Sequence, residues 1–204
     1  MTIKELFDQF IEIKSSKNSK LCIDTFEANL DLINNVDLTN LADYDCIMII
    51  ISDYALVLSY SGYYKKSIQY FDKAIDLFEK FPNFDKDKLF NIPYYETIVF
   101  QKAVTLNNLK YYKDSLLLFQ KLHFAFPDND RYSNWIDSIK IVKLDINSAI
   151  WFVVTFLIMI LRIPLKSKDL ALCEILLYIA TGTFFIAIIN VIKRYIIAIR
   201  KRKK

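Results

Sequence analysis

The chain has 204 residues, of which only two are glycine and four are proline, whereas 16 are phenylalanine and 13 are tyrosine. So few turn-forming residues argue against an all-β architecture and favour long helices with short links. Residues 1–145 hold 17 basic and 21 acidic side chains (net −4), and residues 146–204 hold 10 and 2 (net +8). The acidic front part argues against nucleic-acid binding, which needs a basic surface.

Seven helices are predicted ahead of the apolar C-terminal part. They cover approximately residues 2–14, 20–34, 44–61, 63–81, 93–108 and 111–126, and a seventh begins near Asp128 and runs toward the first apolar segment. Thr2 and Glu5 have the spacing of a capping box for the first helix. The very apolar run "CIMIII" predicts that the third helix is the central buried one, and "PNFDKDK" is a polar link.

An internal repeat links the fourth helix to the sixth. The shared residues recur 48 positions apart, as Tyr64, Ser67, Ile68 and Phe71 and again as Tyr112, Ser115, Leu116 and Phe119, and Ala55 recurs in the preceding helix as Ala103. Small residues let two helices approach closely, and the phenylalanines fill the space beside them. The spacing therefore predicts two stacked helix pairs.

This pattern resembles the tetratricopeptide repeat family over about residues 45–127. Gly62 in the turn, Ala74 at the late small position and Pro127 at the close also match that family. The period of 48 exceeds the usual one of about 34, and Lys110 and Leu122 depart from the pattern in the second unit. The resemblance implies an all-α domain of antiparallel helix pairs of the α-solenoid type, and an irregular helical bundle is the alternative.

Such stacked pairs imply a concave surface that holds a peptide or a partner helix. The inner faces of the third and fifth helices would supply it, with Tyr54, Tyr60, Tyr95 and Gln101 as candidate groove residues. Asp53, Asp72 and Asp76 lie at helical spacing and are expected on solvated helix faces, with a groove lining as the alternative.

No catalytic, cofactor-binding or metal-binding pattern is found. The sequence has a single histidine, His123, no phosphate-binding glycine loop and no zincin or nucleophile-elbow motif. Cys22, Cys46 and Cys173 are far apart, which predicts free thiols. We therefore expect neither an enzyme nor a bound cofactor or metal.

Two apolar segments near the C-terminus predict a membrane hairpin. The first covers residues 146–165, and residues 175–192 form the uncharged centre of the second. The first has 20 residues and is borderline alone, and the second reaches 23 residues when residues 170–174 are added; about 20 helical residues cross a bilayer core of about 30 Å. A chain this small can hardly bury two such helices; a buried or re-entrant pair is the alternative. We expect a front domain at 1–145, a hairpin at 146–192 and a basic tail at 193–204.

The basic tail predicts the orientation of this hairpin. It carries seven Lys or Arg residues among its twelve, so the positive-inside rule places it in the cytoplasm, and two spans return the N-terminus to the same side. No uninterrupted apolar signal segment opens the chain, which agrees with a cytoplasmic front domain. Anionic headgroups are expected at the tail. The residues singled out for the membrane part are Trp151, Arg162, Gly182, Asn190, Lys193 and Arg194.

Two functions follow from this layout. The first is a membrane-anchored interaction or scaffold module that recruits a protein or peptide partner to the membrane surface. The alternative is a small oligomeric membrane effector or pore-forming subunit, for example of a bacterial defence or toxin system, in which copies of the chain associate. Polar residues within the spans either hold the helices together or line a pore, and the first is favoured.

Overall fold

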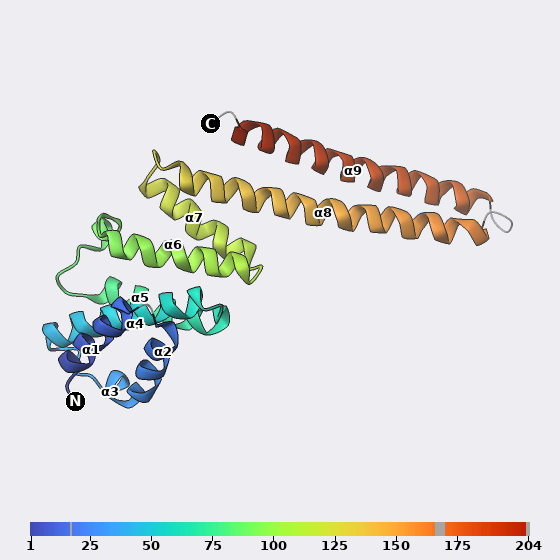
Figure 1. Cartoon of the computed structure of the whole chain (residues 1–204). Coiled ribbons are helices and arrows are strands. Elements are labelled where there is room, and N and C mark those ends of the chain that lie inside the picture. Colours follow the sequence, from blue (N-terminus) through green and yellow to red (C-terminus); the bar gives the residue numbers. More distant parts are fainter. Residues whose placement is uncertain (17, 166–169, 203–204) are drawn as a thin grey trace. The chain divides into compact units, whose positions relative to one another are not determined.

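The computed structural model describes residues 1–16, 18–165 and 170–202, and within these ranges it contains helices and no strand. The chain divides into two compact units, Met1–Asp128 and Asn129–Lys204 (Figure 1). The predicted all-α class and the two long apolar C-terminal helices are confirmed. The expected boundary after residue 145 falls inside a helix of the second unit.

The first unit is made of short and medium helices. Its described elements are α1 (Ile3–Ser15), α2 (Ser19–Ala28), α3 (Leu30–Asn34), α4 (Leu41–Tyr60), α5 (Tyr64–Lys80), the 3-10 helix η1 (Lys86–Asn91), α6 (Pro93–Asn108) and α7 (Tyr112–Ala125). Helix α4 is central, since 12 of its 20 residues are buried, as its apolar run predicts. The α4–α5 and α6–α7 pairs correspond to the two predicted repeat units.

Local hydrogen bonds explain several helix ends. The capping box of α1 is present, because Glu5 N donates to Thr2 Oγ1 over 3.2 Å and Thr2 N donates to Glu5 Oε2 over 2.9 Å. The single helix predicted over 20–34 is wrong: the Asn29 amide donates to the Thr25 carbonyl over 2.8 Å and ends α2, after which α3 begins. Asparagine competes with the helix backbone in this way. The polar link also contains η1, which was not predicted.

The turns that join the two helix pairs repeat in detail. Gly62 and Lys110 are 48 positions apart, and both adopt a left-handed backbone, with φ of 84° and 65°. In each turn the next backbone N–H, from Tyr63 or Tyr111, donates to a helix carbonyl five residues earlier over 2.9 Å. This is the Schellman geometry that usually calls for glycine. The second turn therefore keeps the geometry without the residue that favours it.

The second unit is an antiparallel helical hairpin. It consists of α8 (Asp130–Leu165) and α9 (Leu170–Arg202), which lie side by side along most of their length (Figure 1). The helix predicted from near Asp128 thus continues without interruption into the first apolar segment, and α9 continues through Lys193 into the basic tail.

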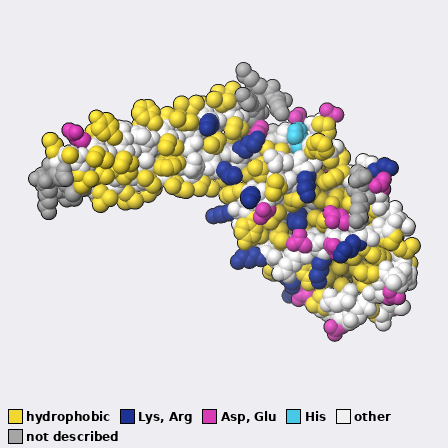
Figure 2. Space-filling view, turned by 180° about the vertical axis from the view of Figure 1, so that it is seen from behind, with side chains coloured by type: hydrophobic (Ala, Val, Ile, Leu, Met, Phe, Trp, Pro, Cys, Tyr) yellow, Lys and Arg dark blue, Asp and Glu magenta, His cyan; other side chains and the backbone are white. Residues whose placement is uncertain are grey.

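A heptad pattern brings α8 and α9 together. The seam residues of α8, buried or partly buried, are Ile141, Leu144, Ser148, Trp151, Thr155, Ile158 and Arg162. Those of α9 are Cys173, Leu176, Ala180, Thr183, Ala187 and Asn190. Alternating steps of three and four residues are typical of a left-handed coiled coil. Most of the other apolar side chains within residues 146–161 and 175–192 are exposed, as Figure 2 shows for the hairpin.

Candidate functional site

The residues expected to pack the repeats lie in the core of the first unit. Seven of the nine have no exposed surface: Ala55, Ser67, Phe71, Ala74, Ala103, Ser115 and Phe119. Tyr64 and Tyr112, which open α5 and α7, are partly buried. Ser115 Oγ donates to the Ala103 carbonyl over 2.8 Å, so α6 and α7 approach closely enough for a side chain to reach the neighbouring backbone.

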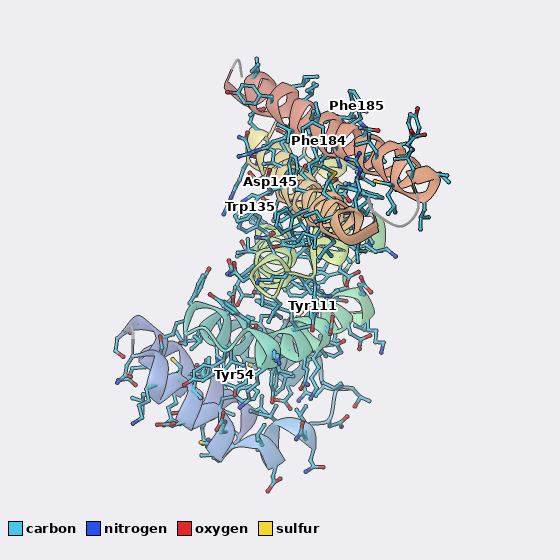
Figure 3. The ribbon with its side chains drawn as sticks, turned by 90° about the vertical axis from the view of Figure 1, so that its right-hand side faces the viewer. Tyr54, Tyr111, Trp135, Asp145, Phe184 and Phe185 are labelled. Atoms are coloured by element: carbon cyan, nitrogen blue, oxygen red, sulfur yellow. The ribbon has the colours of Figure 1, made fainter. Side chains whose placement is uncertain are left out.

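The four residues expected to form a groove on α4 and α6 do not come together. Tyr54 is fully buried among the helices of the first unit (Figure 3), whereas Tyr60 is 68% exposed at the end of α4. The Gln101 amide donates to Ser59 Oγ over 3.0 Å and so joins α6 to α4. Tyr95 lines a groove that α6 forms with α5, α7 and η1.

A groove runs along α6 between α5 and α7. Two hollows of about 380 and 580 Å³ share Lys102, Leu118 and Lys121, so they form one continuous feature. The apolar lining residues are Ile68, Ile75, Leu89, Phe90, Val99, Leu106, Leu117 and Leu118. On α5 the lining positions from Ile68 to Glu79 follow steps of four, three and four, which is one face of a helix over about 16 Å. We call this feature the α6 groove.

Charges of both signs lie within the α6 groove. Lys102 Nζ is 2.5 Å from Asp72 Oδ1, and the Lys102 side chain is only 17% exposed. The Tyr95 hydroxyl donates to Glu79 over 3.4 Å, and burial together with this carboxylate raises the pKa of Tyr95 to about 12. Lys121 adds a further cation. An apolar floor with charges of both signs suits an amphipathic helix.

A buried carboxylate lies beneath α1 and α6. Asp53 has no exposed surface, so its expected place on a solvated face is wrong. Lys14 Nζ on α1 is 2.6 Å from Asp53 Oδ1, and the Tyr94 hydroxyl on α6 donates to the same oxygen. The other carboxylate oxygen has no partner among the described residues. Burial, and then Asp53, raise the pKa of Tyr94 and of the Cys22 thiol, which keeps that thiol unreactive.

Helix α2 covers the face of α4 that carries Tyr54. The Phe26 and Tyr54 rings are stacked with centroids 3.6 Å apart, and Tyr70 meets Tyr54 edge-on at 4.7 Å. Glu27 accepts from the Tyr54 hydroxyl over 3.0 Å and pairs with Lys66 of α5. The bond from Lys66, and then that from Tyr54, lower the pKa of Glu27. A surface that the sequence assigns to a partner is thus occupied by the chain itself.

The seam of the hairpin contains paired polar groups. The Thr155 and Thr183 hydroxyls are 2.7 Å apart, and Arg162 Nε donates to Cys173 Sγ over 3.1 Å. Asn190 is 7% exposed, and its Nδ2 has no partner among the described residues. Hydroxyl pairs of this kind hold helices together in an apolar environment.

The other residues singled out for the membrane part have different surroundings. Trp151 is a partly buried seam residue. Gly182 faces away from the seam, since a Cβ added there would meet no atom within 4 Å, so it provides no close approach between α8 and α9. Lys193 is exposed, and Arg194 Nε is 3.1 Å from Asp145 of α8.

At both ends of the apolar part of the hairpin, charged residues lie at the level where α8 contacts α9. Asp145 pairs with Arg194 at one end, and Arg162 lies beside the first turn of α9 at the other. Between these levels, residues 146–161 and 175–192 carry no charge. At about 1.5 Å per residue, these stretches are about 24 and 27 Å long. Long basic side chains extend the reach of such a layer toward the bilayer core of about 30 Å.

Sequence reasoning missed both the α6 groove and the buried polar cluster. The groove depends on how three helices and η1 pack, which no local pattern encodes. A signal for the buried carboxylate was present, because Asp53 lies between the apolar runs "CIMIII" and "ALVL" of one helix. An acid surrounded in this way is rarely left in water.

Comparisons of the chain with protein-family models, with curated proteins and with solved structures found no match.

Proposed function

We propose that the chain is a membrane-anchored interaction module without catalytic activity. The hairpin crosses the bilayer twice and leaves both termini in the cytoplasm. The first unit is a tetratricopeptide-repeat-like domain that holds a helix of a partner protein in the α6 groove. The single observation that carries this proposal is the groove itself, which is lined by apolar side chains and by charges of both signs, on a unit tethered to an apolar hairpin.

The repeat-like interpretation is supported by the turns. Equivalent left-handed residues and equivalent hydrogen bonds recur at the same 48-residue separation as the buried small residues. Coincidental spacing in an irregular bundle gives no reason for the backbone geometry to recur as well. The long helices of each pair and the inserted link with η1 account for the long period.

Crosslinking from the groove tests the proposed partner site. A photoreactive residue replaces Leu117, which is 51% exposed in the groove, in full-length protein in native membranes. The matched control replaces Leu21 of α2, which is 44% exposed and outside the groove. We expect a discrete crosslinked protein from position 117 alone. Equal crosslinking from both positions, or only lipid adducts from either, would contradict the proposal.

Protease protection tests the proposed orientation. Protease added to sealed cells should leave the basic tail from Lys193 intact, and the same protease should cut it in inside-out vesicles. Cleavage in intact cells would place the tail outside and overturn the assignment. Recovery of the full chain in the soluble fraction without detergent would remove the anchor altogether.

One feature favours the alternative, an oligomeric membrane effector. Thr181 and Gly182 are exposed on α9 within its apolar part, away from α8. Small residues on an outward face let helices of other copies approach closely. A membrane-potential dye and the mass of the detergent-solubilised protein separate the two functions: depolarisation on expression together with a discrete oligomer supports the effector.

A further inference from the structure

The two repeat turns place tyrosines and lysines on one edge of the first unit. The C-terminal ends of α4 and α6 lie side by side, because Ser59 Oγ and Thr105 Oγ1 are 2.8 Å apart. Both turns therefore project from the same end of the helix pairs. The exposed residues there are Tyr60, Tyr63, Lys65, Lys110, Tyr111 and Lys113. We call this surface the tyrosine–lysine edge; Figure 3 labels Tyr111 on it.

Packing leaves much of the surface of the aromatic residues on this edge exposed. Tyr63 and Tyr111 are equivalent residues of the two turns, and each closes its turn with its backbone N–H. Their side chains are 57% and 52% exposed, and Tyr60 is 68% exposed. A Schellman turn commonly packs a hydrophobic residue at this position against the last turn of the helix, yet more than half of the surface of each tyrosine is left exposed.

Two of the lysines on the edge, Lys65 and Lys113, lie in the first turns of α5 and α7, where the helix dipole disfavours a positive charge. Helix N-termini favour acidic residues, but α5 begins with Lys65 and Lys66 and has no acid in its first turn. Lys66 is paired with Glu27, and Asp114 is the acid beside Lys113 in α7. Among the described residues, Lys65 has no ion-pair partner, and neither do Lys110 and Lys113. Residues that lower the local stability of a helix end indicate a surface with a function other than folding.

We propose that the tyrosine–lysine edge binds the headgroup layer of an anionic membrane. Tyrosine prefers this layer because its ring is apolar and its hydroxyl is polar, and lysine is attracted to anionic lipid. The hairpin holds the edge near such a surface at high effective concentration, so individually weak contacts suffice. This inference rests on the proposed membrane anchoring. Each lysine close to the surface raises the equilibrium constant for membrane contact about fivefold. The three unpaired lysines together raise it by roughly 100-fold.

Quenching by lipids with a nitroxide on the headgroup tests the contact in the full chain. A fluorophore on Asn108→Cys reports on the edge, and the same fluorophore on Asn83→Cys reports on the opposite end of α5, both residues being exposed. Both proteins also carry Cys46→Ser, because the other two native thiols are buried. The vesicles contain either phosphatidylcholine alone or a mixture with phosphatidylglycerol.

A triple variant and a matched control separate local contact from net charge. The edge variant carries Lys65→Gln, Lys110→Gln and Lys113→Gln. The control carries substitutions of three exposed lysines outside the edge: Lys73→Gln, Lys80→Gln and Lys88→Gln. Circular dichroism checks that both variants remain folded.

The expected result is strong quenching at position 108, and not at 83, in phosphatidylglycerol vesicles. The edge variant should lose most of it, and the control variant should keep it. Equal quenching at positions 108 and 83 would overturn the proposal, and so would equal quenching in vesicles with and without phosphatidylglycerol. So would lysine-dependent binding of polyglutamate without a lipid effect, since the ligand would then be an acidic protein. Failure of the protein to float with vesicles would instead reject the anchoring.

Discussion

The two turns at positions 62 and 110 make opposite predictions for one kind of substitution. Lys110 holds φ at 65°, where a side chain with a Cβ costs about 1–2 kcal/mol relative to glycine. Glycine in exchange gains unfolded-state entropy worth about 0.4–1 kcal/mol. Lys110→Gly should therefore stabilise the first unit by about 0.5–1 kcal/mol. Gly62→Ala should destabilise it by a similar amount, and by backbone strain alone, because a Cβ there meets no atom within 4 Å.

Thermal unfolding of the full chain in detergent measures both effects. For a unit of 128 residues, 1 kcal/mol corresponds to about 4 °C in the midpoint. The control is Lys110→Ala, which keeps the Cβ and removes only the lysine chain, so its midpoint should stay near that of the parent. If Lys110→Gly lowers the midpoint, or if Lys110→Ala raises it as much as Lys110→Gly does, the turn does not impose the strain argued here.

Three further predictions concern the polar contacts. Asp53→Ala should lower stability by about 2–4 kcal/mol, because it leaves a buried hydroxyl of α6 unpaired. Asp72→Ala removes a carboxylate that is 57% exposed and should cost less than about 1 kcal/mol. Urea midpoints compare the two variants. Thr155→Cys with Thr183→Cys should form a disulfide on mild oxidation, and failure to crosslink would contradict the hairpin register. Glu27 has a lowered pKa in the folded state, so its contribution is present above the ordinary value of 4.5 and is lost as the pH falls through the lowered one. Glu27→Gln should therefore flatten the loss of stability as the pH falls below 4.5.

The elements that sequence reasoning predicted well are those with a local cause. The capping box of α1 depends on two residues three positions apart. The two apolar helices are likewise visible in composition alone. Each of these features needs no knowledge of what lies beside it in the fold.

The features that sequence reasoning missed have partners far along the chain. Asp53 was assigned to water because its partners, Lys14 and Tyr94, are 39 and 41 residues away. Tyr54 was assigned to a partner-binding groove because no residue near it in the sequence predicts that Phe26 stacks on its ring. Periodicity identifies which face of a helix is apolar. It does not say whether the chain or another protein covers that face.

The α6 groove and the tyrosine–lysine edge use different parts of the same helices, and this bears on how the proposed function works. The groove follows one face of α5 from Ile68 onward, whereas the only residue of α5 in the tyrosine–lysine edge is Lys65, in the first turn. A helix bound along α6 therefore leaves Tyr63 and Lys65 uncovered. On the proposed arrangement the edge fixes the orientation of the first unit on the lipid surface while the groove remains open. Loss of the edge lysines should then weaken partner capture only in anionic membranes and leave it unchanged in neutral ones, a dependence that a lysine in direct contact with the partner would not produce.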